Sequence, residues 1–208
     1  MTGWLDAFLQ RLLEVPAAWV HLTLALAAAL ENLVPPIPAD VVILFGGFLA
    51  GQGSISLWVA FMVVWISNVG GALLVYLLGR VYGARFFSGR LGSFILKPQQ
   101  LTTLNGFYHR YGFTVIFVGR FFPMFRAMVP AFAGVARLDL VRTIVPLALA
   151  SGLWYGTVLY LGAVAGQNWE QIAAAVASAG WWLYLVALVG VLVLGGWWWR
   201  SRHGEENA

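Results

Sequence analysis

The sequence predicts an all-α integral membrane protein that forms a single membrane domain over residues 1–208. Two observations predict this class. The composition is 61% hydrophobic and 10% charged, whereas soluble domains carry about 25% charged residues. Several apolar runs also approach the length of about 20 residues that a helix needs to cross a bilayer. The chain has no cysteine, which excludes disulfides, thiolate metal sites and a cysteine nucleophile.

Four apolar runs have the length and composition of membrane spans. The last of them is framed by tryptophans at both ends, which is typical of a helix whose ends lie at the membrane–water interface. The first residues of the chain mix apolar and charged side chains at helical spacing, as in a helix that lies along the interface. The predicted segments are an interfacial helix at 1–15 and spans at 17–34, 57–79, 143–166 and 180–199.

Two further apolar segments, 36–52 and 113–135, are interrupted by proline. Proline removes a backbone donor and clashes with the preceding turn. A broken helix at membrane depth persists only where protein or water satisfies the freed backbone groups. We therefore interpret both segments as re-entrant helical hairpins. The residues expected to shape them are Pro35, Pro36, Pro38, Pro123, Pro130 and Gly134.

The two hairpin-plus-span units resemble each other at an offset of 83 residues, where Gly51 matches Gly134 and Gly79 matches Gly162. A re-entrant hairpin returns to its own side before the span crosses, so a second copy has the opposite orientation, as in many transporters. The sequence therefore predicts an inverted repeat of re-entrant hairpin plus transmembrane helix, with flanking transmembrane and amphipathic helices. A structure in which the two hairpin-plus-span units have the same orientation would contradict this hypothesis.

Basic residues indicate the orientation of the spans. With the N-terminus in the cytoplasm, that side receives all of the 12 Lys and Arg residues except Arg120 and Arg126. This asymmetry agrees with the positive-inside rule and also places the C-terminus in the cytoplasm. An alternative makes 17–34 the first limb of a hairpin with the prolines at its tip, which moves the N-terminus outside. The basic segment 84–112 is a cytoplasmic amphipathic connector near anionic head groups, or a site for a regulatory partner.

Four ionisable residues stand well inside the predicted membrane segments: Glu31, Asp40, Arg120 and Arg126. Placing such a group at a helix centre costs about 2.5–3.5 kcal/mol, so we expect the four to pair or to face water. Their formal charges sum to zero. The helical period places the two members of each pair on different faces of a continuous helix, whereas breaks at the prolines let them converge on a common cavity.

The arginines suit a phosphate, because a guanidinium stays protonated and donates a planar fork of hydrogen bonds. The four residues are therefore the candidate substrate-binding site. Glu31 and Asp40 are also the candidates for proton coupling, since carboxylates can take up and release protons during a transport cycle. A purely structural alternative is that ion pairs only lock the hairpins together. Asn68 and Ser151, equivalent at the 83-residue offset, either polarise the cavity or join helices.

The stretch "YGFTVIFVGRFFPMFRAMVPAFAG" at 111–134 resembles the signature F-x-x-R-x-x-P-x-x-R-x-x-x-P-x-x-A-G of the DedA family of bacterial membrane proteins, which are related to the eukaryotic VTT-domain lipid scramblases. The acidic stretch "ENLVPPIPAD" at 31–40 is a looser match, because Asp40 stands where the family often has glutamate. The resemblance covers about residues 25–170. The positions that fit the signature are Phe117, Arg120, Pro123, Arg126, Pro130, Ala133 and Gly134.

The resemblance implies a flippase that moves undecaprenyl phosphate across the bacterial cytoplasmic membrane with dependence on the proton motive force. It also implies that the membrane acids and arginines are the functional residues. The expected partners are a polyprenyl-phosphate or phospholipid substrate and membrane lipids, with homo-oligomers left open. No nucleic acid, metal, cofactor or enzyme activity is expected.

Three alternatives remain at the level of sequence. A phosphatidylethanolamine flippase or scramblase would use the same four residues. A proton-coupled antiporter for small solutes fits the membrane carboxylates, but paired arginines repel cations. A lipid phosphatase needs a nucleophile or base beside the arginines, and His21 is the one histidine in a predicted membrane segment.

Overall fold

The computed structural model describes residues 11–33, 38–83, 112–172 and 174. These residues contain helices and no strand, so the all-α class is confirmed over them. The chain divides into two compact units, Met1–Gln167 and Asn168–Ala208. In the second unit, a backbone hydrogen bond joins Ile172 to Asn168. The first unit contains α2 (Ala17–Leu30), α3 (Ala39–Gly51), α4 (Leu57–Tyr82), α7 (Phe113–Gly119), α8 (Pro123–Val135) and α9 (Leu140–Gln167).

Some predicted segments fall where the structure gives no description. Most of the interfacial helix at 1–15, nearly all of the connector at 84–112 and the whole span at 180–199 lie outside the described residues. Pro35 and Pro36 also lie outside them. These expectations therefore stay predictions.

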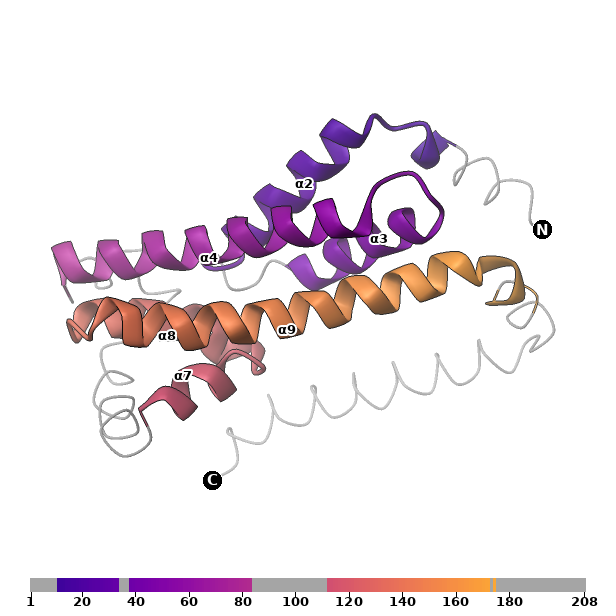
Figure 1. Cartoon of the computed structure of the whole chain (residues 1–208). Helices are drawn as coiled ribbons and strands as arrows, with labels where there is room; N and C mark the ends of the chain where they lie inside the picture. The colour runs from indigo at the N-terminus through magenta and orange to yellow at the C-terminus, as the bar shows by residue number, and fades with distance from the viewer. Residues whose placement is uncertain (1–10, 34–37, 84–111, 173, 175–208) are drawn as a thin grey trace, which may run out of the picture. The chain divides into compact units, whose positions relative to one another are not determined.

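Helices α4 and α9 are the two described helices long and apolar enough to cross a membrane, with 26 and 28 residues and hydropathies of 2.0 and 1.6. They contain the predicted spans 57–79 and 143–166. The two helices run side by side in opposite directions (Figure 1), and the indole of Trp65 donates a hydrogen bond to the Ala148 carbonyl at 2.8 Å. Large apolar side chains such as Trp58, Ile66 and Leu153 are exposed on their outer faces, as expected of surfaces in contact with lipid.

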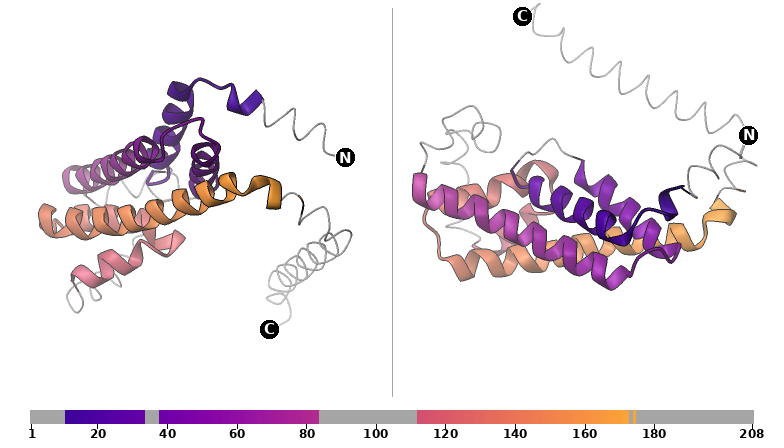
Figure 2. Two further views of the ribbon diagram at one scale, coloured as in Figure 1. Left: turned by 45° about the vertical axis from the view of Figure 1, so that its right-hand side comes forward. Right: turned by 90° about the horizontal axis from the view of Figure 1, so that it is seen from above.

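The first proline cluster separates two helices rather than breaking one. Residues 36–52 do not form a hairpin by themselves, because α3 runs unbroken from Ala39 to Gly51 with Pro38 at its N-cap. The chain reverses between α2 and α3, which run in opposite directions (Figure 2) and pack where Leu24 covers Gly46. This is the alternative arrangement, with residues 17–34 as the first limb. The physical reason is that no proline follows Pro38 within α3, so nothing interrupts its hydrogen bonds.

The second proline segment, 113–135, is broken once. Helix α7 ends at Gly119, and α8 begins at Pro123. Proline is well suited to the first turn of a helix, where its missing N–H has no partner to lose. Pro130 lies inside α8. The turn at 120–122 therefore divides this segment into two short helices.

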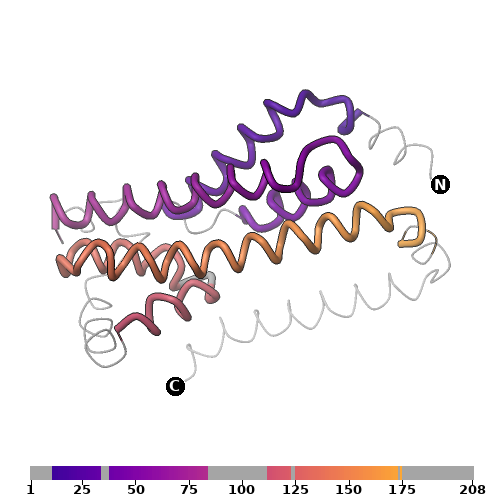
Figure 3. The backbone as a smooth tube through the Cα atoms, in the orientation of Figure 1, coloured from indigo at the N-terminus to yellow at the C-terminus, as the bar shows by residue number. Residues whose placement is uncertain are grey.

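The two repeats make equivalent contacts between helices. A Cβ atom on Gly134 of α8 would lie 2.1 Å from the Tyr76 carbonyl oxygen of α4, and one on Gly51 of α3 would lie 2.1 Å from the Ala163 oxygen of α9. Glycines at equivalent positions thus let α8 pack closely along α4 and α3 along α9. The opposite directions of α4 and α9 (Figure 3) and these contacts agree with an inverted repeat whose first copy is α2–α4 and whose second copy is α7–α9. The arrangement of each copy as a re-entrant hairpin plus a span stays a prediction.

Candidate functional site

The four membrane charges lie where α2 ends, α3 begins and the chain turns between α7 and α8. Glu31 caps the C-terminus of α2, and Asp40 lies in the first turn of α3. Arg120 caps the C-terminus of α7, and Arg126 lies in the first turn of α8. The proline-rich breaks therefore place all four side chains at helix ends, where they can approach one another as the sequence predicted.

Arg126 binds both carboxylates. Its Nη1 and Nη2 atoms donate to Oδ1 and Oδ2 of Asp40 at 3.0 and 3.1 Å, and Nη1 also donates to Oε1 of Glu31. The guanidinium carbon lies 5.2 Å from the centroid of the Trp154 ring, within the range of a cation–π interaction. Only 4% of Arg126 is exposed, so its guanidinium stands apart from solvent.

The two carboxylates differ in accessibility. Glu31 is 6% exposed, and its Oε2 accepts a hydrogen bond from the Tyr155 hydroxyl at 2.7 Å. The Asp40 side chain is 38% exposed, and its Oδ1 accepts a hydrogen bond from the Trp154 indole at 2.9 Å. Glu31 is thus enclosed by its partners, whereas Asp40 lies at the boundary between the site and its surroundings.

Arg120 is held by neutral partners. Its Nη1 donates to Oδ1 of Asn32 and to the backbone oxygen of Arg126, both at 3.0 Å. Its Nη2 donates to Ser151 Oγ at 2.7 Å and to Asn68 Oδ1. Arg120 is 2% exposed. Within the described part of the chain, no carboxylate lies within salt-bridge distance of its guanidinium. Amide, hydroxyl and peptide dipoles therefore replace the water around this cation.

Asn68 of α4 and Ser151 of α9 connect the two repeats. They occupy equivalent positions 83 residues apart, and Ser151 Oγ donates to Asn68 Oδ1 at 3.1 Å. Both residues bind Arg120, so they polarise the site and join helices at the same time. The acids come from the first repeat and the arginines from the second.

Three residues of the site were missed by sequence reasoning: Asn32, Trp154 and Tyr155. Asn32 follows Glu31 directly, and its Nδ2 donates to the backbone oxygens of Ala28 and Asn68. Trp154 and Tyr155 are neighbours in an otherwise apolar span. An indole N–H and a phenol buried in such a span need hydrogen-bond partners, and that need is the signal that could have revealed them.

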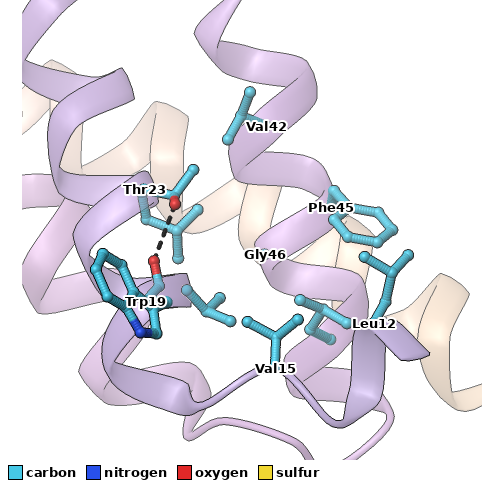
Figure 4. A pocket seen from close by; sticks show the side chains of 10 residues that line it. Leu12, Val15, Trp19, Thr23, Val42, Phe45 and Gly46 are labelled. Atoms are coloured by element: carbon cyan, nitrogen blue, oxygen red, sulfur yellow. Dashed lines mark hydrogen bonds between the residues drawn. The ribbon is translucent and has the colours of Figure 1, made fainter. Parts of the chain in front are cut away.

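An apolar cavity of about 190 Å³ lies between α2 and α3, and its walls include Trp19, Thr23, Val42 and Phe45 (Figure 4). The Thr23 hydroxyl donates to the Trp19 carbonyl at 2.9 Å. None of the four charged residues lines this cavity. Its chemistry suits hydrocarbon better than a phosphate, which would lose its hydrogen bonds there.

The site as a whole combines two buried arginines with two carboxylates. Arg126 presents a planar fork of donors, whose charge is balanced by carboxylates in the same cluster. Among the residues that the structure describes, no group of three His, Cys, Asp or Glu side chains is placed to hold a metal ion. The chemistry available to these side chains is therefore ion pairing, hydrogen bonding and proton uptake.

Comparison with known proteins places this site in a family. A family model described as the VTT domain matches residues 37–164. This range includes Asp40, Arg120, Arg126 and Trp154. No solved structure gives a significant match.

Three relatives illustrate the similarity. An alkaline phosphatase-like protein of Lactococcus lactis subsp. cremoris (strain MG1363) is 31% identical over 190 residues, covering 89% of this chain and 88% of the relative. Undecaprenyl phosphate transporter A of Bacillus subtilis (strain 168) is 28% identical, covering 69% of this chain and 73% of the relative. Undecaprenyl phosphate transporter A of Staphylococcus aureus (strain NCTC 8325 / PS 47) is 25% identical, covering 78% and 82%.

Proposed function

Because the chain belongs to the VTT-domain (DedA) family, we propose that it is a lipid transporter of a bacterial cytoplasmic membrane and that it moves undecaprenyl phosphate between the two leaflets. The observation that carries the proposal is the buried Arg126 fork, which faces two carboxylates at the meeting point of the repeats. Two relatives are named undecaprenyl phosphate transporters, which supports the choice of substrate. The distribution of basic residues supports a cytoplasmic C-terminus.

The phosphate would bind to the guanidinium fork of Arg126 through two of its oxygens. Arg120 would fix the start of α8, because its Nη1 donates to the Arg126 backbone oxygen. The prenyl chain would stay in lipid, so that only the head group crosses the site. The charged cluster would thus bind only the phosphate head group. The formal charges of the cluster sum to zero before the substrate binds.

Proton coupling would reside in Glu31 and Asp40. Both carboxylates bind Arg126, and a protonated carboxyl group binds a guanidinium far less strongly than a carboxylate does. Proton uptake on one side of the membrane would therefore loosen Arg126, and proton release on the other side would restore the pairs. This scheme makes transport depend on the proton motive force.

The name alkaline phosphatase-like, carried by one relative, keeps a lipid phosphatase as a second candidate. That reaction needs a base or nucleophile beside the arginines. His21 bonds through Nδ1 to the Ala17 carbonyl of its own helix at 2.6 Å. Ser151 Oγ accepts from Arg120 and donates to Asn68, so its proton is directed to an amide oxygen rather than to a base. These contacts favour transport.

Reconstitution into vesicles tests the proposal. Undecaprenyl phosphate, phosphatidylethanolamine and neutral undecaprenol are each followed from the outer to the inner leaflet, with and without an imposed proton gradient. We expect transport of undecaprenyl phosphate alone, increased by the gradient. Arg126→Ala should abolish this transport while the protein still folds. Arg142→Ala is the matched control, because it removes an exposed arginine in the first turn of α9.

Each contrary result has a defined meaning. Normal transport by Arg126→Ala would overturn the assignment of Arg126. Equal transport of all three lipids would show that the cluster does not recognise the phosphate. Preferential transport of phosphatidylethanolamine would change the substrate but keep the site, and release of phosphate by the purified protein would favour the phosphatase.

A further inference from the structure

Asp40 occupies the donors that a substrate phosphate needs. Its two carboxylate oxygens each accept a hydrogen bond from the terminal nitrogens of Arg126, at 3.0 and 3.1 Å. Arginine binds carboxylate and phosphate through the same bidentate fork. A phosphate can therefore reach these two N–H groups only if the Asp40 carboxylate leaves them.

We propose that Asp40 is an internal substitute for the substrate phosphate, displaced when the phosphate binds, and that Trp154 is a further phosphate-binding residue. This inference rests on the proposed function. It adds Trp154 to the residues that bind the phosphate, and it adds the displacement of Asp40 as a step of phosphate binding. Asp40 Oδ1 accepts from Arg126 Nη1 and also from the Trp154 indole at 2.9 Å. Its departure releases the arginine fork and the indole N–H together, and both already point at one anionic oxygen.

Of the two carboxylates on Arg126, Asp40 is the one that can leave. Its side chain is 38% exposed, whereas that of Glu31 is 8% exposed. Glu31 is also fixed on its far side by the Tyr155 hydroxyl at 2.7 Å. Moving Asp40 outward leaves the Glu31–Tyr155 hydrogen bond intact, whereas moving Glu31 would leave the Tyr155 hydroxyl without its acceptor. Glu31 therefore stays as the permanent counter-ion of Arg126.

The guanidinium has one more donor than a carboxylate can use. Arg126 Nε is buried and makes no hydrogen bond to any atom of the chain that the structure describes. A buried donor without an acceptor is costly. A phosphate monoester carries three free oxygens where a carboxylate has two, so it can satisfy the terminal nitrogens and still offer an oxygen to Nε or to the Trp154 indole. The set of donors thus fits phosphate better than it fits Asp40.

Charge balance permits the exchange. The cluster holds Arg120, Arg126, Glu31 and Asp40, whose formal charges sum to zero. A phosphate group that replaces Asp40 brings at least one negative charge to the same place, so the two buried arginines are not left with Glu31 alone. The same chemistry is offered by free phosphate and by a lipid phosphate, and the experiment separates these two sources.

Equilibrium binding to the purified full-length protein tests the displacement of Asp40. The probes are undecaprenyl phosphate, inorganic phosphate and neutral undecaprenol. Asp40→Asn keeps the size of the side chain and removes the competing charge, so we expect it to bind undecaprenyl phosphate about tenfold more tightly than the wild type. The matched control is Asp139→Asn, which makes the same change at an exposed position before α9 and should leave the affinity unchanged.

A second pair of variants tests Trp154 as a ligand. In the Asp40→Asn background, Trp154→Phe removes the indole N–H and keeps a ring beside Arg126. We expect it to weaken phosphate binding about tenfold, the effect of one hydrogen bond to a charged group at the lower end of its range. Trp65→Phe in the same background is the control, because it also removes an indole hydrogen bond, but one whose acceptor is the backbone oxygen of Ala148 at 2.8 Å rather than a charged group.

The outcomes separate this inference from the proposed function. If the wild type prefers undecaprenyl phosphate over undecaprenol but Asp40→Asn binds equally or more weakly, Asp40 is not a competitor and the inference fails alone. If Trp154→Phe matches Trp65→Phe, Trp154 is not a ligand. If no form of the protein prefers the phosphate over undecaprenol, both the inference and the proposed function fail. Tighter binding of inorganic phosphate by Asp40→Asn would support displacement and identify the phosphate group itself as the ligand.

Discussion

Arg120 and Arg126 lie six residues apart in one signature, yet their surroundings differ in kind. Arg120 is bound by amide, hydroxyl and peptide oxygens from the turn after α2 and from α4, α8 and α9. Arg126 is bound by the carboxylates of Glu31 and Asp40. Both cations are buried, so the protein stabilises one by dipoles and the other by ion pairs. The carboxylates that bind Arg126 lose their charge when they take up a proton, whereas the neutral groups that bind Arg120 have no charge to lose.

This difference indicates separate roles for the two arginines. The neutral partners of Arg120 include Asn68 of α4 and Ser151 of α9, so Arg120 ties both repeats together. Arg126 has one accessible partner, Asp40, and one buried donor that no described atom of the chain accepts from. We therefore expect substitutions at Arg120 to act mainly on stability and substitutions at Arg126 to act mainly on substrate binding.

The largest effect on stability is expected for Arg120→Ala. The change removes the donor to buried oxygens of Asn32, Asn68 and Ser151, and each unsatisfied buried group costs about 1–3 kcal/mol. We expect the free energy of unfolding to fall by at least about 3 kcal/mol, measured by denaturation of the purified protein in detergent. Arg126→Lys keeps a cation beside the carboxylates, so it should lower the free energy of unfolding by less. Equal stability of Arg120→Ala and Arg126→Lys would contradict the separate roles of the two arginines.

A smaller effect is expected for Glu31→Gln, and it sharpens the contrast between the carboxylates. Glu31 is buried and bonded to both Arg126 and Tyr155, so its neutralisation should cost about 2 kcal/mol, within the range for losing a hydrogen bond to a charged group. Asp40→Asn should cost less than about 1 kcal/mol, because its pair is partly exposed. Thermal unfolding of both variants in the same detergent measures the difference. The reverse order would show that Asp40 is the structural carboxylate.

The smallest of the three effects is expected for Tyr155→Phe. The phenol donates to Glu31 at 2.7 Å and accepts from Asn68 at 2.9 Å, so it links the charged group around Arg126 to the neutral group around Arg120. Its removal should cost about 1–2 kcal/mol. Tyr160→Phe makes the same change at an exposed position on the same helix and should be close to neutral. A double-mutant cycle of Tyr155→Phe with Glu31→Gln measures their coupling, and additive effects would argue that the hydroxyl does not act through Glu31.

The sequence predicted the helical class, the two long apolar helices that contain residues 57–79 and 143–166, and the four charges, because these follow from local composition and proline spacing. It did not predict which arginine binds the carboxylates. The partners of Arg126 are 86 and 95 residues away, and helical rotation within one segment carries no information on that choice. The position of the first chain reversal was also misplaced, because proline spacing identifies a break but not which two helices it joins. Trp154 and Tyr155 were missed because aromatic residues are common in spans.

The division of charge between the repeats has a consequence for synthesis of the chain. Glu31 and Asp40 enter the membrane with the first repeat, and the arginine that neutralises them is made 95 and 86 residues later. At about 5–20 residues per second, the nascent chain carries two acids without their cation for roughly 4–19 s. During this interval the first repeat depends on protonation, on water or on the insertion machinery to shelter its carboxylates. The charged site is therefore completed only after the second repeat, which contains Arg126, has been synthesised.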